Sequence, residues 1–456
     1  MKGKNIYKIF IVLSLMLGMI FSILIPLYQV PDEVTHLNLL YSNLGNDIYF
    51  TDYTNNYGDT TRIIGNYDEK INLDEYFSFD EKLNIIDKIK KIDIHVISYF
   101  PQTIGIIVSE LFNLPILVAV TISEFFAVIF YTFICLIALR LIPIKKELMM
   151  MIMLLPMCIQ QMGSFSYDMI LICFSFLFIS YIFYLKYKKK SIDIKDLGIL
   201  VGILSVIALV KIPYVLLGLL IFILPTKKII LLDKIKKIYS KNKKIKLAFT
   251  LICVAIIVGF VLIKFLLKID YVKVLFAFIL NPIEGIKLII RTLMKNYLYY
   301  PMSIVGYFGW LDTPVSILFL IFIIIFLLIV NLLSKDNNSK KYNLKLKERI
   351  YILSLGIFLS LIIIISLYNW TLGYLGVDNS NLSIYHYSYY MDLLNSILGV
   401  QGRYFIPVIP LFFIPFDLNL NGIKNRKIIL IILQIIYYII LFTYMLIVVL
   451  KRYWLI

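Results

Sequence analysis

Long apolar runs recur along the chain and are separated by shorter polar segments. Residues 9–29 form the first run, directly after Lys2, Lys4 and Lys8, and no small-residue cleavage pattern precedes the polar stretch that follows. We therefore expect an uncleaved first membrane helix, because about 20 apolar residues span a bilayer. The complete set of runs predicts about 11 crossings, within a range of about 10 to 13. The predicted crossings are 9–29, 114–140, 148–160, 168–185, 197–210, 212–225, 247–267, 315–333, 350–368, 403–416 and 428–450.

Composition supports the same fold class. Of 456 residues, 61% are hydrophobic and 16% are charged, a balance that an aqueous surface does not accommodate. The pattern predicts an all-α polytopic membrane protein in which residues 1–456 form one integral membrane domain. Several runs are shorter than a bilayer requires, so tilted or broken helices are expected.

The basic residues predict the orientation in the membrane. By sequence count, the polar segments 1–8, 140–147, 186–196, 226–246, 334–349 and 417–427 together carry a net charge of about +22, which exceeds the formal +17 of the whole chain. These segments are predicted to face the cytoplasm together with the N-terminus. The acid-rich segment 30–94 is predicted to lie outside. All basic segments stay on one side only if residues 197–225 form a helical hairpin that turns near Lys211.

Other classes of function find little support. The lysines of 226–246 are interleaved with a single aromatic residue, Tyr239, so they indicate contact with lipid rather than nucleic acid. All four cysteines lie inside apolar runs and offer no disulfide or metal spacing. No inverted repeat and no nucleotide-binding glycine loop is evident.

The predicted topology places five polar clusters at the outer surface. The first is VPDEVTH at 30–36, with Asp32, Glu33 and His36. If a helix starts after Pro31, Asp32 and His36 are four residues apart and share a face. The alternative is an ordinary helix start with acids in the first turn, but that role does not require a histidine.

Two further clusters hold opposite charges. Asp168 in QQMGSFSYD begins an apolar run, where it is either a helix N-terminal acid or part of a site. Lys211 in ALVKIPY lies within hydrocarbon, where an unpaired lysine costs about 3 kcal/mol. It therefore needs an anionic partner, and both an ion pair with Asp168 and a bound phosphate remain open.

The last two clusters precede apolar runs. GYFGWLDTP at 306–314 supplies Trp310 and Asp312, with an interfacial anchor as the alternative role of the tryptophan. VQGRYFIP at 400–407 supplies Gln401, Arg403 and Tyr404. A guanidinium at this position suits a phosphate or pyrophosphate group, with snorkelling to the interface as the alternative.

These motifs, in this order, resemble the bacterial membrane-protein family catalogued as DUF2142, which in turn resembles the GT-C glycosyltransferases. The resemblance implies a GT-C-like fold whose extracytoplasmic loop, 30–113, carries interface helices, with smaller outer loops at 268–314 and 369–402. HVISYFPQTIG at 95–105 is similar to the interface helix of such enzymes, which would bring His95 and Tyr99 near the site without a defined role.

The resemblance also implies an activity, the transfer of a sugar from a polyprenyl-phosphate donor to a glycan or lipid-linked acceptor at the outer face of the cell membrane. Asp32 is the candidate general base, and Glu33 and His36 would orient it or contact the acceptor. The candidate substrate- and phosphate-binding residues are Lys211, Arg403, Gln401, Tyr404, Asp168, Trp310 and Asp312.

The expected partners are the lipid bilayer, the donor, the acceptor, a polyprenyl-phosphate sugar synthase and a flippase. The use of a divalent metal is left open: Asp32, Glu33 and Asp168 could form an oxygen-rich site, although their spacing does not demand one, and no other cofactor is expected. Two alternatives stay open. One is a transporter or flippase for lipid-linked glycans, in which Lys211 would pair with Asp168. The other is a polysaccharide polymerase or ligase that uses a diphosphate-linked donor.

Overall fold

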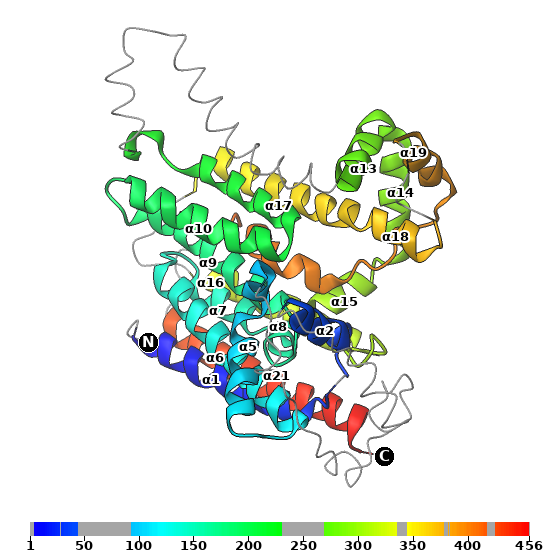
Figure 1. Ribbon diagram of the computed structural model, residues 1–456. Coiled ribbons are helices and arrows are strands. Elements are labelled where there is room, and N and C mark those ends of the chain that lie inside the picture. Colours follow the sequence, from blue (N-terminus) through cyan, green and yellow to red (C-terminus); the bar gives the residue numbers. More distant parts are fainter. Residues whose placement is uncertain are drawn as a thin grey trace.

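The computed structural model describes residues 4–27, 29–43, 93–229, 269–334, 344–377, 382, 384–416 and 425–455. These residues form helices and one short β-hairpin (Figure 1). The elements up to residue 229 are α1 (Lys4–Leu24), α2 (Glu33–Asn43), η2 (Ile94–Tyr99), α5 (Phe100–Leu111), α6 (Ile116–Leu141), α7 (Lys146–Met153), α8 (Pro156–Met162), α9 (Asp168–Tyr187), α10 (Ile194–Val210), η3 (Ile212–Ile223) and η4 (Thr226–Lys228). The elements from residue 269 are α13 (Ile269–Leu280), α14 (Pro282–Lys295), α15 (Tyr299–Val305), β1 (Tyr307–Phe308), β2 (Thr313–Pro314), α16 (Ile317–Leu333), α17 (Leu346–Ser366), α18 (Tyr368–Tyr374), α19 (Ile384–Leu393), η5 (Gly402–Val408), α20 (Pro410–Phe413) and α21 (Arg426–Tyr453).

Six described helical segments are long and apolar enough to cross a membrane. They are Asn5–Leu24, Ile94–Leu111, Ile116–Leu141, Asp168–Tyr187, Leu346–Tyr374 and Ile428–Tyr453. Two shorter apolar helices, η3 and α16, accompany them. The predicted crossing 247–267 lies outside the described residues. The chain is therefore helical with several apolar spans, as expected for a multi-pass membrane protein.

Two predicted crossings are broken rather than continuous. Residues 148–160 divide into α7 and α8 because Pro156 lacks an amide hydrogen and restricts the residue before it. Residues 403–416 form the 3₁₀ turn η5 and the short α20, which contain Pro407 and Pro410. Irregular backbone at membrane depth is tolerated where other helices bury it.

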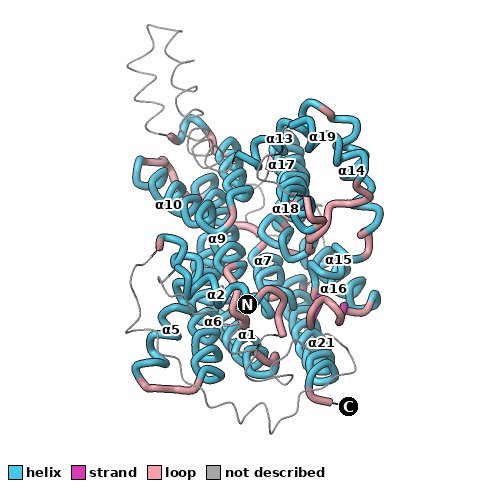
Figure 2. The backbone as a smooth tube through the Cα atoms, turned by 45° about the vertical axis from the view of Figure 1, so that its right-hand side comes forward, coloured by secondary structure: helices cyan, strands magenta, loops and turns pink. Residues whose placement is uncertain are grey.

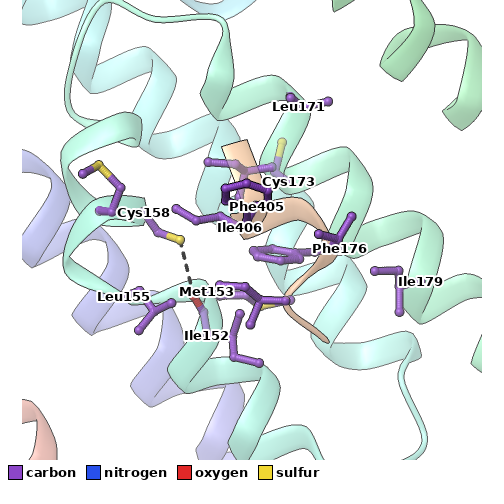
Figure 3. Close-up of a cluster of buried hydrophobic side chains, with 14 of the residues drawn as sticks. Ile152, Met153, Leu155, Cys158, Leu171, Cys173, Phe176, Ile179, Phe405 and Ile406 are labelled. Atoms are coloured by element: carbon purple, nitrogen blue, oxygen red, sulfur yellow. Dashed lines mark hydrogen bonds between the residues drawn. The ribbon is translucent and has the colours of Figure 1, made fainter. Parts of the chain in front are cut away.

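The two broken segments lie together in the core. Figure 3 shows Leu155 and Cys158, from the α7 and α8 region, in one apolar cluster with Phe176 of α9 and with Phe405 and Ile406 of η5. All five side chains are at least nine-tenths buried. Regular helices therefore surround a proline-interrupted centre.

Helices α1 and α6 pack antiparallel. The Ser14 and Thr132 hydroxyls are 2.7 Å apart, and the Arg140 guanidinium lies 5.8 Å from the ring centre of Tyr7. The start of α1 therefore lies beside the end of α6. This is the end of the bundle that the charge pattern predicts to be cytoplasmic.

Several other basic side chains make contacts at the same end of the bundle. The Lys145 Nζ donates to the Phe416 carbonyl at 2.5 Å, Lys186 pairs with Glu348, and Arg426 donates to the Leu333 carbonyl. We call this the basic end. It collects the start of α17 and α21 and the ends of α6, α9 and α16.

The opposite end of the bundle holds the end of α1 and the end of α21, where the Trp454 indole donates to the Leu24 carbonyl at 2.7 Å. It also holds Lys211, between α10 and η3. The far ends of α10 and η3 meet where the Ile192 amide donates to the Lys228 carbonyl at 2.7 Å. The predicted hairpin that turns near Lys211 is thus confirmed.

A separate group of helices lies beyond the C-terminal end of α17. Helices α13, α14 and α19 gather there beside α18 (Figure 1 and Figure 2). The predicted loops 268–314 and 369–402 therefore pack against each other as helices.

The segment expected as an interface helix, 95–105, belongs to a longer helical segment that packs along α6. A Cβ atom on Gly105 of α5 would lie 2.3 Å from the Ser123 Cα of α6. Residues 94–111 are long and apolar enough to cross a membrane. Close approach of two backbones, which only glycine permits here, fixes this pair.

We expect Gly105→Ala to lower the thermal unfolding midpoint of the detergent-solubilised protein, because the new methyl group has no room against α6. Overpacking of this kind costs roughly 1–3 kcal/mol. Gly198→Ala in α10 is the matched control, since its Cβ meets nothing within 4 Å. An equal or higher midpoint for Gly105→Ala than for wild type would show that α5 and α6 are not in close contact.

Candidate functional site

The acidic motif at 30–36 lies at the start of α2, at the end of the bundle opposite the basic end. The Asp32 carbonyl accepts the His36 amide at 2.9 Å, which confirms that these residues are one helical turn apart. Asp32 itself has φ +70°. This left-handed conformation is uncommon outside glycine, although aspartate tolerates it better than most residues. It turns the carboxylate out of the helix.

Asp32 is the first member of a row of alternating charges. The Arg403 Nη2 donates to the Asp32 Oδ2 at 2.6 Å. The Arg403 Nε lies 3.4 Å from one carboxylate oxygen of Asp168, and the Lys211 Nζ donates to the other at 3.0 Å. We call Asp32, Arg403, Asp168 and Lys211 the charge row. It joins the start of α2, η5, the start of α9 and the α10–η3 turn.

Burial differs sharply along the charge row. The side chains of Arg403 and Asp168 are 4% and 5% exposed, whereas those of Lys211 and Asp32 are 22% and 49% exposed. The two central charges must be paired because an isolated buried ion is strongly destabilising. The Asp32 carboxylate is the most open part of the charge row, and Lys211 is partly accessible.

Tyrosine rings surround Lys211. Its Nζ lies 3.9 Å from the ring centre of Tyr404 and 5.1 Å from that of Tyr167, within the range of cation–π attraction. The Tyr214 hydroxyl donates to the Tyr404 carbonyl at 2.6 Å. Both Tyr404 and Asp168 therefore hold the lysine in place.

Glu33 is buried and reaches away from its own helix. Its carboxylate accepts the Phe165 amide at 3.0 Å and lies beside Glu124 of α6. The carboxylates of Asp32 and Glu33 thus contact distant segments, which disfavours a role limited to the start of α2. The sequence analysis did not single out Glu124, although it is a lone acid in an apolar run.

His36 is held in an aromatic pocket of side chains. Its Nδ1 lies 2.8 Å from the Tyr99 hydroxyl, and the Tyr167 ring packs edge-on at 4.5 Å. Burial lowers the pKa of the His36 imidazole to about 4. The ring is therefore neutral at pH 7. Tyr99 lies at the site as expected, whereas the backbone of the exposed His95 contacts Asp93.

Asp312 lies in a second ion pair rather than in the charge row. Its carboxylate accepts from the Arg452 Nε at 3.1 Å and the Arg452 Nη2 at 2.6 Å, a bidentate pair at the end of α21. The neighbouring Tyr453 hydroxyl donates to the Gln29 carbonyl at 3.4 Å, three residues before Asp32. The sequence analysis missed Arg452. The pairing of Asp312 with Arg452 was therefore not predicted.

Trp310 and Gln401 flank these two sets of charges. Trp310 is half-buried in the turn between β1 and β2, next to Asp312. The Gln401 carbonyl accepts the Tyr404 amide at 3.2 Å at the start of η5, while its buried Oε1 has no hydrogen-bond partner among the described residues. That oxygen is an acceptor two residues from Arg403.

The carboxylates do not form a metal centre in this arrangement. Asp32, Asp168 and Glu33 face Arg403, Lys211 and a backbone amide instead of one another. Within the described ranges, no group of three His, Cys, Asp or Glu residues is placed to hold a metal ion. We assign no metal to these residues.

The low pKa of His36 predicts a pH effect on stability. His36 binds a proton near pH 6.5 in the unfolded chain and near pH 4 in the folded protein. The contribution of the neutral, buried imidazole to the free energy of unfolding is therefore fully present above about pH 6.5 and is lost as the pH falls toward 4. The histidine accounts for about 3 kcal/mol of this loss. We expect His36→Gln to unfold with a smaller change in midpoint between pH 7.5 and 5 than wild type, measured by thermal unfolding in detergent. Parallel curves would show that His36 is accessible to protons in the folded state.

A family model of a predicted membrane protein, DUF2142, matches residues 15–412. No curated protein and no solved structure matches the chain. The matched range includes the whole charge row, whereas Arg452 lies beyond it. The chain therefore belongs to the DUF2142 family of predicted membrane proteins.

Proposed function

We propose that this protein is a membrane glycosyltransferase that takes a sugar from a polyprenyl-phosphate carrier and transfers it to a glycan or lipid-linked acceptor at the outer face. The observation that supports it most is the contact between Asp32 and Arg403, 371 residues apart in the chain and 2.6 Å apart in space. It sets a half-exposed carboxylate beside a fixed guanidinium. Sugar transfer from a phosphate uses a base for the acceptor and positive charge for the departing phosphate, and these two groups can supply both.

The reaction explains why opposite charges lie together. The acceptor hydroxyl attacks the anomeric carbon and gives its proton to a carboxylate, while the bond from that carbon to the phosphate oxygen breaks and the phosphate leaves with the electron pair. In this proposal Asp32 accepts the proton. Arg403, whose planar donors suit a phosphate, opposes the charge of the leaving group together with Lys211.

The neighbouring residues have supporting parts in the proposal. The neutral His36, fixed by Tyr99, can donate or accept one hydrogen bond from the acceptor or sugar without adding charge. The Gln401 Oε1, which has no hydrogen-bond partner in the described part of the chain, is a further acceptor for a hydroxyl group. Trp310 has an indole that can stack on a sugar ring or hold the lipid. A synthase and a flippase would supply the donor.

The proposal predicts that Asp32→Asn abolishes transfer. Asparagine keeps an oxygen for Arg403 but cannot take a proton, and loss of a general base lowers the rate by roughly 10²–10⁴-fold. The measurement is the cell-surface glycan of a deletion strain complemented with each variant. We expect wild type to restore a glycan that Asp32→Asn does not restore at equal protein abundance.

Asp392→Asn serves as the matched control, because Asp392 is an exposed acid of the adjoining helix group with no contact to the charge row. It should restore the glycan fully. Complete restoration by Asp32→Asn would remove the general base from the proposal.

One observation favours a second candidate, a transporter or flippase for lipid-linked glycans. Lys211 and Asp168 form an ion pair at 3.0 Å, as expected for charges that line a transport pathway. The same pair also serves a transferase by holding Lys211 near Arg403. The contact alone therefore does not choose between the two.

Reconstituted protein distinguishes these candidates. We expect proteoliposomes that contain labelled polyprenyl-phosphate sugar and no acceptor to keep the label in its original leaflet, because a transferase does nothing to the donor without an acceptor. Protein-free liposomes provide the background rate. Movement that requires the protein and is lost in Lys211→Met would instead establish transport.

A further inference from the structure

Helix α14 exposes an apolar face to the surroundings of the protein. The residues of this face repeat with helical spacing and are between 52% and 69% exposed. They are Ile283, Ile286, Ile290, Met294 and Tyr297, the last just beyond the helix end. Their neighbours Ile279 and Leu280, at the end of α13, are 68% and 62% exposed and extend the same apolar surface. We call this the α14 apolar face.

A row of cations flanks the α14 apolar face. Lys287, Arg291 and Lys295 follow one another at intervals of four residues, so they lie along one side of the helix. Glu284 is the one acid of α14 and binds Lys287 at 2.7 Å. The row therefore keeps a net positive charge. Positive residues beside an apolar face are typical of helices that lie in the plane of a membrane surface.

The buried side of α14, together with part of the cation row, anchors the helix to the segment that leads to the charge row. The Arg291 Nη2 donates to the Met391 carbonyl at 2.9 Å, and the Thr292 Oγ1 accepts the Ile397 amide at 2.9 Å. The Lys295 Nζ lies 3.4 Å from the Ser396 hydroxyl. Helix α14 is thus fixed along the chain that continues to Arg403.

The connection from α14 to Arg403 continues through α15. The Gly402 amide donates to the Ser303 Oγ at 2.6 Å. A Cβ atom on Gly402 would lie 2.2 Å from that oxygen and 2.4 Å from the Ile304 nitrogen, so α15 contacts the backbone beside Arg403 directly. The cation row and the charge row therefore belong to one continuous packed unit.

The direction of α14 agrees with a surface position. Helix α17, a candidate membrane span, ends beside this helix group, and α14 runs crosswise to it (Figure 1). A helix in that direction at the end of a span lies along the membrane plane. Its apolar face then enters the acyl region while its cations stay at the level of the head groups.

We propose that α14 is a membrane-surface helix that binds the anionic phospholipid head groups of the leaflet next to the charge row. Charge complementarity selects this partner: Lys287 and Lys295 meet phosphate, and the isoleucines meet acyl chains. The proposal adds a lipid-binding surface to the site. It does not depend on sugar transfer.

The test uses full-length protein in phosphatidylcholine nanodiscs that contain about one third phosphatidylglycerol. Nitroxide labels at Ile286→Cys and Ile290→Cys report depth through their access to oxygen and to a water-soluble nickel chelate. The described cysteines are buried, and Cys253 is replaced by serine in every variant. We expect both labels to prefer oxygen, whereas a control label at the exposed Lys190→Cys of the basic end prefers the chelate.

The second measurement is the preference of the protein for spin-labelled phosphatidylglycerol over spin-labelled phosphatidylcholine. We expect Lys287→Gln with Lys295→Gln to lower this preference, by about fivefold for each lysine removed. Arg291 is left in place because it binds backbone carbonyls. Lys190→Gln with Lys195→Gln is the matched control and should leave the preference at that leaflet unchanged.

Two results would overturn the proposal. Labels on α14 that prefer the chelate would show an aqueous surface that another protein covers. Labels that prefer oxygen without a loss of lipid preference in the double variant would show an anchor with no anion recognition. Neither result bears on the Asp32→Asn experiment, so this proposal and the transferase can fail separately.

Discussion

Arg403 and Asp168 are charged side chains buried in a low-dielectric interior, and the need to give each of them partners of opposite charge constrains the rest of the structure. An isolated charge buried to this degree costs several kcal/mol, so each must meet opposite charges. Asp168 is placed between the guanidinium and Lys211, and Arg403 lies between two carboxylates. The start of α9, the α10–η3 turn, η5 and the start of α2 must therefore converge. Membrane helices that otherwise share mainly apolar contacts are brought into register by these ions.

Convergence also explains why the centre of the bundle is irregular. A straight helix through residues 403–416 would carry Arg403 at a fixed pitch, whereas the prolines of η5 and α20 allow its first turn to adapt to α9 and α15. The break between α7 and α8 lies against the same segment. The prolines leave some backbone carbonyl groups without helical hydrogen bonds, and the surrounding helices shield these groups from lipid. Regular spans thus surround the interrupted ones, and one interrupted segment, η5, carries Arg403 of the charge row.

Much of this arrangement was predictable from sequence because charge in hydrocarbon is so restrictive. Lys211 needed an anion, and an ion pair with Asp168 was one of the two partners considered. The structure contains that pair, and Arg403 joins Asp168 to Asp32. Asp312 was expected at the site but pairs with Arg452. This pairing was not predicted because the basic residues at the end of the last apolar run were not considered. Glu124 was similarly overlooked inside α6. Broken helices were expected because several apolar runs are short, but the positions of the breaks at Pro156 and Pro407 were not predicted.

The separation of Asp32 and Arg403 by 371 residues has a consequence for biosynthesis. At a translation speed of roughly 5–20 residues per second, Asp32 is in the membrane for roughly 20–75 s before Arg403 is made. During that interval its carboxylate has no guanidinium, and α1 lacks α21, whose last turn binds the Leu24 carbonyl through Trp454. The first and last helices of the chain close the bundle together. A chain released before Arg403 is made therefore contains most of the described spans but no assembled charge row.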